Sequence, residues 1–134
     1  MSKGLFITGT GTDIGKTFVT GLIVKKMRAA GFDTGYYKAA ISGAESVAAS
    51  DAGYVNRVGN INEDEKMLLS YLYKTAVSPH LAAQLEGHPV EREQVEKDFA
   101  RVSARYPYVT MEGSGGIICP IRYDDQAHYF LEDV

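Results

Sequence analysis

Residues 8–17 read TGTGTDIGKT, and this glycine-rich stretch decides the fold of the chain. A short apolar, β-prone run at residues 5–8 leads into it, and we expect that run to form a buried strand. Residues 17–30 follow with apolar side chains at helical spacing, and Gly31 supplies a stop at the end of the helix. A glycine-rich loop between a strand and a helix, ending in Gly-Lys-Thr, is typical of a phosphate-binding P-loop.

The loop departs from the usual P-loop spacing by one residue. Four residues normally separate the first glycine from Gly-Lys-Ser/Thr, but here Thr10 stands at that first position and Gly9 lies one residue earlier. We still expect Lys16 to reach the β- and γ-phosphates of a nucleotide and the Thr17 hydroxyl to bind Mg²⁺. The alternative is a chance Gly-Lys-Thr in an ordinary loop, which the flanking strand, helix and glycines disfavour.

Further segments have the patterns of strands and helices. Residues 35–38 are the next strand candidate, and they complete a βαβ unit, which implies that the two strands form a parallel pair with a right-handed crossover. The other expected elements are helices at 51–58, 79–85 and 91–106 and a third strand at 108–111. We therefore predict an α/β fold, a three-layer α/β/α P-loop NTPase architecture with a mostly parallel sheet, in a single domain over residues 1–134.

Three segments have weaker patterns. Residues 39–50 are small and polar, so we expect a functional loop there. The sequence becomes polar after Arg122, and we expect no closing helix or strand in that part. Residues 117–120 are apolar, and Cys119 is expected to be a core residue.

Composition limits the classes of function. The chain has 134 residues, 45% of them apolar, and a net charge of −3, so no basic field points to a nucleic-acid partner. The single cysteine excludes an intrachain disulfide. The apolar run near the N-terminus is too short for a signal sequence or a membrane span. We expect a cytoplasmic protein with no membrane partner.

Four segments resemble motifs of the dethiobiotin synthetase family, and they occur in the same order as in that family. The first is the variant loop at residues 8–17, and the second is Tyr37-Lys38 followed by Ser42-Gly43. The others are SPHLAA at residues 78–83 and EGSGG at residues 112–116, in which Ser114 stands where the family has alanine. Together they span residues 4 to about 121, and the ordered set is far more specific than any one of them.

The resemblance implies a ligase of biotin biosynthesis that uses ATP, Mg²⁺, CO₂ or bicarbonate, and 7,8-diaminononanoate. One amine of the diamine would form a carbamate, and ATP would phosphorylate the carbamate to a carbamic–phosphoric anhydride. Attack by the second amine would close the ureido ring of dethiobiotin, with release of ADP and phosphate. The family also implies a homodimer in which the neighbouring subunit completes part of the diamine site.

The resemblance also implies roles for single residues. Lys38 would be the active-site lysine, acting with Lys16 on the transferring phosphoryl group. Ser42 and Thr12 would bind the diamine. Mg²⁺ would be surrounded by oxygen ligands from Thr17, Asp51 and Glu112. ATP binding is assigned to Thr12, Asp13, Ile14, Gly15, Lys16, Thr17, Phe18, Asp51, Glu112, Gly113, Ser114 and Gly115.

Simpler interpretations exist for two of these residues. Lys38 could be a solvated charge at the end of a strand. Asp51 follows a serine and could be no more than a helix cap.

Two other functions remain open. An amidotransferase-type synthetase of the cobyrinic acid amide family has a similar P-loop, but it also carries a glutaminase domain with a nucleophilic cysteine, for which this chain has no room. A non-enzymatic P-loop nucleotide-binding protein related to the partitioning ATPases usually has a second lysine early in the loop, and residues 9–12 contain none. Diamine-dependent ATP turnover would distinguish the synthetase from both.

Members of the dethiobiotin synthetase family are longer than this chain, and their later strands and adenine-binding part have no counterpart here. We therefore expect weak preference for adenine over other bases. Two alternatives follow: a piece or truncated form of the enzyme, or a reduced protein that binds phosphates and catalyses poorly.

Overall fold

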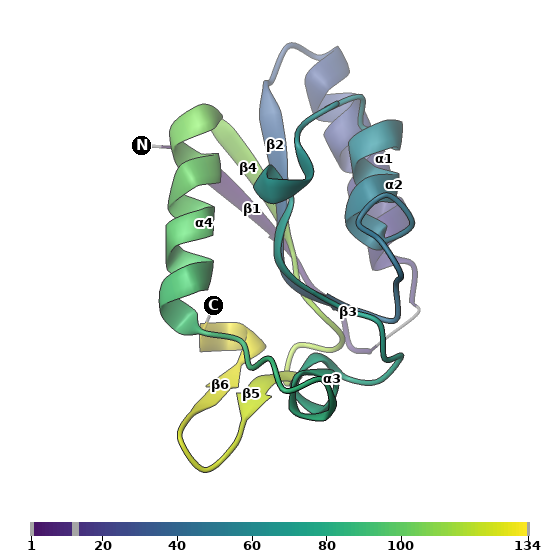
Figure 1. Cartoon of the computed structure of the whole chain (residues 1–134). Helices are drawn as coiled ribbons and strands as arrows, with labels where there is room; N and C mark the ends of the chain where they lie inside the picture. The colour runs from purple at the N-terminus through teal and green to yellow at the C-terminus, as the bar shows by residue number, and fades with distance from the viewer. Residues whose placement is uncertain (1, 12–13, 134) are drawn as a thin grey trace.

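The computed structural model describes residues 2–11 and 14–133, and its centre is a four-stranded sheet (Figure 1). The strands lie in the order β1-β4-β2-β3, and every neighbouring pair is parallel. Their bounds are β1 Lys3–Ile7, β2 Thr34–Ser42, β3 Leu69–Tyr73 and β4 Tyr108–Glu112. The prediction of an α/β fold with a mostly parallel sheet is confirmed.

Helices cover both faces of this sheet, which gives the three layers. Helices α1 and α2 lie together over one face, α4 lies over the other, and α3 lies near the carboxyl ends of the strands (Figure 1). Their bounds are α1 Lys16–Ala29, α2 Asp51–Val58, α3 Pro79–Leu85 and α4 Arg92–Arg105. The helix bounds predicted from punctuation by proline, serine and glycine are therefore confirmed to within one or two residues.

The C-terminal part contains structure that the sequence patterns did not predict. Strands β5 (Pro120–Tyr123) and β6 (His128–Phe130) form an antiparallel hairpin, and a short 3₁₀ helix, Leu131–Asp133, follows. A second 3₁₀ helix, Glu65–Met67, precedes β3. The expectation of no strand after Arg122 is therefore wrong. The strands of the hairpin have only four and three residues, too few for a detectable apolar period. Asp124 closes the turn by accepting hydrogen bonds from the backbone N–H groups of Gln126 and Ala127.

The helix after the P-loop packs through small side chains rather than through the apolar ones that give its period. Thr20, Gly21 and Val24 are its buried residues, whereas Phe18 and Leu22 are exposed. At Gly21 an added Cβ would lie 3.1 Å from the ring of Tyr54 in α2, so the absence of a side chain lets the two helices approach closely. Apolar periodicity indicated the helix correctly but not the face that it buries.

Two strand predictions also need correction. Strand β1 was expected to be buried and to pair with β2, but β4 lies between them. Leu5 is 41% exposed and Phe6 is 45% exposed, because within the described residues β1 pairs only with β4. Strand β2 continues to Ser42, and residues 39–41 are buried in it rather than part of a loop. Alanine has low strand propensity, so tertiary burial rather than local preference makes Ala39 and Ala40 part of the strand.

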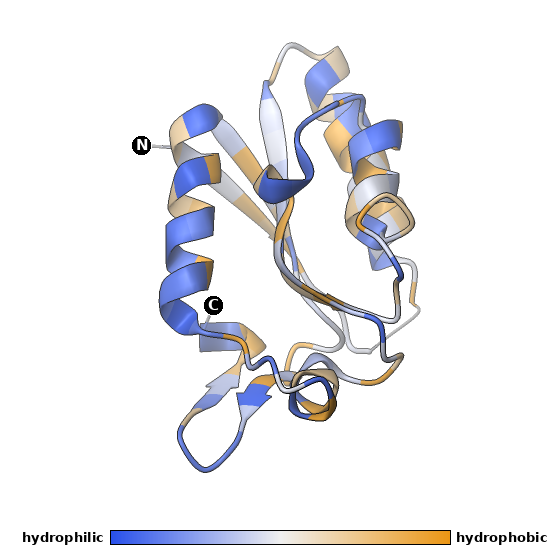
Figure 2. Ribbon diagram, viewed as in Figure 1, coloured by the Kyte–Doolittle hydropathy of each residue, from blue (hydrophilic) through white to orange (hydrophobic). Residues whose placement is uncertain are grey.

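Strand β2 supplies the centre of the core on both faces of the sheet. Tyr36 and Tyr37 are adjacent and almost fully buried, and their side chains lie on opposite faces. Tyr37 packs edge-to-face on Phe99 of α4, with ring centroids 5.5 Å apart. Hydrophilic residues predominate along α4 (Figure 2), while its residues Val95 and Val102 are buried. Within the described part of the chain, none of the helices combines the length and hydropathy needed to cross a membrane.

Candidate functional site

The P-loop links β1 to the N-terminus of α1. Gly15 immediately precedes the helix with φ 91°, a left-handed conformation that glycine adopts without strain. Lys16 begins the helix, and its ammonium donates a hydrogen bond to the Gly11 carbonyl oxygen at 2.7 Å. The helix N-terminus and this ammonium place positive charge at one end of the loop, as an anion site requires. Thr12 and Asp13, both predicted site residues, lie outside the described residues.

The loop after β4 packs directly on the P-loop. The Ile117 backbone N–H donates to the Gly9 carbonyl oxygen at 2.9 Å, and the Gly113 N–H donates to the Ile7 carbonyl oxygen at 2.9 Å. An added Cβ at Gly116 would lie 3.1 Å from the Thr10 carbonyl oxygen. The two glycine-rich segments, distant in sequence, thus form one continuous wall at the carboxyl end of the sheet.

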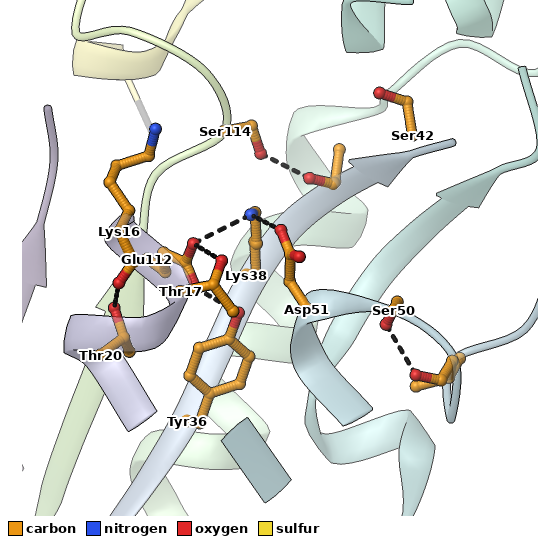
Figure 3. A network of polar contacts seen from close by, with 12 residues as sticks. Lys16, Thr17, Thr20, Tyr36, Lys38, Ser42, Ser50, Asp51, Glu112 and Ser114 are labelled. Carbon is orange, nitrogen blue, oxygen red and sulfur yellow. Dashed lines mark hydrogen bonds and ion pairs between the residues drawn. The ribbon is translucent and has the colours of Figure 1, made fainter. Parts of the chain in front are cut away.

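A buried cluster of polar side chains lies beside this wall. Glu112, the last residue of β4, accepts hydrogen bonds at Oε1 from the Thr17 hydroxyl at 2.7 Å and from the Lys38 ammonium at 3.2 Å. The same ammonium lies 2.9 Å from Asp51 Oδ2 (Figure 3). Tyr36 donates to the other Glu112 oxygen, Oε2, at 2.9 Å. We call these five residues the Glu112 cluster.

Parallel strands explain why these residues meet. Tyr37 of β2 and Met111 of β4 lie side by side in the register, so Lys38 and Glu112 follow at the same level. Functional groups of open parallel sheets gather at the carboxyl ends of the strands, and Glu112 lies at such an end. Lys38 instead lies in the middle of β2, which continues past the end of β4 to Ser42. Asp51 arrives from the first residue of α2 and faces Lys38. Asp51 is therefore more than a helix cap, because it also pairs with Lys38 in the site.

The electrostatics of the cluster are unusual for a protein interior. The side chains of Lys38 and Glu112 are 6% and 0% exposed, whereas that of Asp51 is 47% exposed. Lys38 is thus held as a buried cation between two carboxylates, and the interpretation of Lys38 as a solvated charge is wrong. Burial, and next the charge of Lys38, lower the pKa of Lys16. Burial, and next the charge of Glu112, raise the pKa of Tyr36, so its hydroxyl stays protonated and donates.

The oxygen atoms of the cluster fit a magnesium ion. Mg²⁺ prefers oxygen ligands, and it is usually bound by one or two carboxylates together with substrate phosphates. The Thr17 hydroxyl and Glu112 Oε1 are 2.7 Å apart. Asp51 lies close to them, because the Lys38 ammonium contacts both Glu112 and Asp51. Among the residues that the structure describes, no group of three or more histidine, cysteine, aspartate or glutamate side chains is placed to hold a metal ion. A magnesium ion here would therefore need phosphate oxygens of a nucleotide among its ligands.

Lys38 and Asp51 stand between two clefts. The first, of about 280 Å³, is lined by Glu112 and by the P-loop and start of α1, including Ile14, Gly15, Lys16, Thr17 and the exposed Phe18. The second, of about 550 Å³, is lined by Ser42, by the segment before α3 and by Ser114. Gly115 lines both clefts. A phosphate group in the first cleft and a second molecule in the other would therefore meet at Lys38.

Two predicted site residues, Ser42 and Ser114, line the second cleft, although Ser114 was expected to bind ATP and does not line the first cleft. The Ser42 hydroxyl donates to the Val77 carbonyl oxygen at 2.5 Å and keeps its lone pairs free to accept. The Ser114 hydroxyl donates to the Ala40 carbonyl oxygen, which ties the loop after β4 to β2. Cys119 is half-buried and lines this cleft, so its assignment to the core is wrong. Burial raises the pKa of the Cys119 thiol, which makes it a poor nucleophile at neutral pH.

Tyr36 is the member of the Glu112 cluster that the sequence motifs did not reveal. It lies two positions before Lys38 on β2, so the alternation of side chains in a strand places both on one face. That alternation was the available signal. The bond to Glu112 depends on the pairing of β2 with β4, which a single sequence does not give.

Comparison with known proteins shows which proteins this chain resembles over most of its length. A family model described as an AAA domain matches residues 3–132. The ATP-dependent dethiobiotin synthetase BioD of Brachyspira hyodysenteriae is 49% identical over 134 residues, which is 100% of this chain and 61% of that protein. The proteins of the same name from two Clostridium botulinum strains are each 52% identical. The Loch Maree match covers 90% of this chain and 55% of that protein. The Eklund 17B match covers 94% and 57%.

The chain thus spans between 55% and 61% of the length of these relatives. Its similarity to dethiobiotin synthetases, predicted from four short segments, is confirmed over almost the whole chain. By the match over residues 3–132, the protein belongs to the AAA domain family of P-loop proteins.

Proposed function

We propose that this protein is a ligase that converts 7,8-diaminononanoate, CO₂ and ATP to dethiobiotin, ADP and phosphate in biotin biosynthesis. The observation that carries the proposal is the buried Lys38 at the junction of two clefts, one formed by the P-loop and one large enough for a small organic substrate. The names of the similar proteins from Brachyspira and Clostridium support it. We further propose that the enzyme is cytoplasmic and works as a homodimer.

In the proposed reaction, the first cleft holds the ATP phosphates. Lys16 and the backbone N–H groups at the start of α1 bind the β- and γ-phosphates, with Gly115 and Phe18 at the edge of the nucleotide site. Gly113 is buried and does not line this cleft, so its assignment to the nucleotide site rests on the resemblance alone. Thr17, Asp51 and Glu112 would hold Mg²⁺, which when bound neutralises charge on the phosphates. Thr12 and Asp13 belong to the same proposed site by sequence.

Lys38 acts where the two substrates meet. An oxygen of the carbamate attacks the γ-phosphorus, the bond to ADP breaks, and negative charge moves onto the transferring oxygens. The Lys38 ammonium, fixed by Glu112 and Asp51, stabilises that charge without having to reorganise. The second amine then attacks the carbonyl carbon, and phosphate leaves as the ureido ring closes.

The second cleft suits the diamine. Ile41, Val77 and Pro79 give it apolar walls for the methylene chain, and Ser42 places a hydroxyl among them. Small-molecule sites commonly combine apolar walls with a few polar groups that fix orientation. We propose that Ser42, with Thr12, positions an amine of the substrate next to Lys38.

Replacing Ser42 by alanine is expected to raise the KM for the diamine by about five- to tenfold, because one hydrogen bond of ordinary strength is lost. The affinity for ADP should not change, since Ser42 lines only the second cleft. Steady-state kinetics with varied diamine, together with ADP titration, measure both quantities. The matched control is Ser46→Ala, an exposed serine outside both clefts. An unchanged KM in Ser42→Ala would remove Ser42 from the diamine site.

The proposed function is tested by phosphate release from ATP with Mg²⁺ and bicarbonate, with and without 7,8-diaminononanoate. Release that depends on the diamine supports the synthetase. Nucleotide binding without diamine-dependent release, in folded protein, contradicts it and favours the non-enzymatic P-loop protein. Release that depends on glutamine and a corrinoid carboxylate instead would favour the amidotransferase-type synthetase. Competition between ATP and other nucleoside triphosphates tests the expectation of weak base preference.

A further inference from the structure

Tyr36 completes the set of donors around Glu112. The two oxygens of this carboxylate are used differently: Oε1 accepts from Thr17 at 2.7 Å and Lys38 at 3.2 Å, and Oε2 accepts from the Tyr36 hydroxyl at 2.9 Å. Tyr36 and Glu112 are each only 1% exposed. Within the described residues, Tyr36 is the only side chain that donates to Oε2.

The strand register brings the Tyr36 ring to this place. Tyr36 lies beside Thr110 in the pairing of β2 with β4, and Glu112 follows Thr110 by two positions on the same face. The ring therefore stands below Glu112, and its hydroxyl points up to the carboxylate (Figure 3). The hydroxyl of the neighbouring Tyr37 lies on the opposite face, where it bonds to Ser70 and to the Val95 carbonyl oxygen.

This arrangement fixes which carboxylate oxygen faces the P-loop. A glutamate carboxylate turns easily about its last torsion, which has broad preferences. A donor on Oε2 holds that torsion so that Oε1 stays toward the Thr17 hydroxyl, the side from which a magnesium–nucleotide complex would approach. Partners of this kind orient metal ligands, and their loss typically lowers metal affinity by about 10- to 100-fold.

We propose that Tyr36 is a positioning residue, which holds the Glu112 carboxylate with Oε1 toward Thr17 and thereby sets how strongly magnesium promotes nucleotide binding. The inference rests on the magnesium site of the proposed function. It does not depend on the diamine chemistry, because it concerns binding of the nucleotide alone.

The test is calorimetric titration of ADP into the protein, with Mg²⁺ and with EDTA. The ratio of the two affinities gives the gain in affinity due to magnesium. We expect Tyr36→Phe to reduce this gain by about tenfold and to leave the affinity in EDTA unchanged. The matched control is Tyr37→Phe, which removes an equally buried hydroxyl from the same strand and is expected to leave the gain unchanged. If the substitutions merely loosened the fold, the affinity for ADP in EDTA would fall as well, in Tyr36→Phe and Tyr37→Phe alike.

An unchanged gain in Tyr36→Phe, an equal loss in both variants, or a wild-type protein with no magnesium-dependent gain would each overturn the inference. A second measurement needs no variant. In wild-type protein labelled at the tyrosine ring, the resonance of Tyr36 is expected to move when Mg²⁺ joins bound ADP, while that of Tyr37 stays in place, and a Tyr36 resonance that does not move counts against the inference. If wild-type protein shows no diamine-dependent phosphate release, but Tyr36→Phe still reduces the gain in ADP affinity due to magnesium, only the proposed function is contradicted.

Discussion

Replacing Lys38 by methionine is expected to lower diamine-dependent phosphate release by about 100- to 1000-fold, the usual effect of removing a preorganised group that stabilises transition-state charge. Methionine keeps much of the length and apolar character of the lysine stem but has no charge. The ammonium contacts both carboxylates of the site at the junction of the two clefts, so other cations are poorly placed to replace it. Single-turnover phosphate release measures the loss.

The substitution also has an effect on stability that must be separated from catalysis. Removing Lys38 leaves Glu112 as a buried carboxylate without its cation, and breaking a buried pair in this way typically costs about 3–5 kcal/mol. The double variant Lys38→Met, Glu112→Gln should regain part of the lost thermal midpoint but no turnover. The control Lys74→Met breaks only an exposed ion pair with Glu45 and is expected to change neither quantity. Turnover near the wild-type rate in a folded Lys38→Met protein would contradict the catalytic role.

Replacing Lys16 by alanine is expected to weaken ADP binding by roughly 100-fold, because a charge-assisted contact to phosphate is lost from a site on the P-loop. Lys16 begins α1, and its ammonium reaches back over the loop to the Gly11 carbonyl oxygen. Calorimetric titration measures the affinity. Lys25→Ala is a suitable control, because Lys25 is an exposed lysine in the C-terminal half of the same helix. Equal affinities of Lys16→Ala and wild-type protein for ADP would mean that phosphates bind elsewhere.

Much of the fold could be predicted because short-range chemistry marks it. The P-loop is defined by glycines and Gly-Lys-Thr, and the start of α3 by Ser78 and Pro79. Other features depend on contacts distant in sequence. The buried face of α1 is made by Gly21 and other small residues, and β2 extends through alanines that only the surrounding helices and strands bury. The hairpin β5–β6 has too few residues for a detectable period.

The site was predictable to a similar degree and for similar reasons. Lys38, Asp51 and Glu112 were expected near one another, and the structure brings all three together because the middle of β2, the end of β4 and the start of α2 converge there. Their roles toward ATP and Mg²⁺ stay predictions until they are measured. Tyr36 was not expected, because its role comes from the register between β2 and β4. Local spacing therefore predicts which charged residues lie in the site, but not which neighbouring residues orient their side chains.

The most direct test of the proposed function is incorporation of labelled bicarbonate into an acid-stable product by the protein with ATP, Mg²⁺ and 7,8-diaminononanoate. Carbamates lose CO₂ in acid, whereas the ureido ring of dethiobiotin keeps the label. We predict label in dethiobiotin in proportion to the phosphate released, and none in Lys38→Met. Phosphate release without acid-stable label, or no reaction by folded protein that binds ATP, would contradict the proposed function.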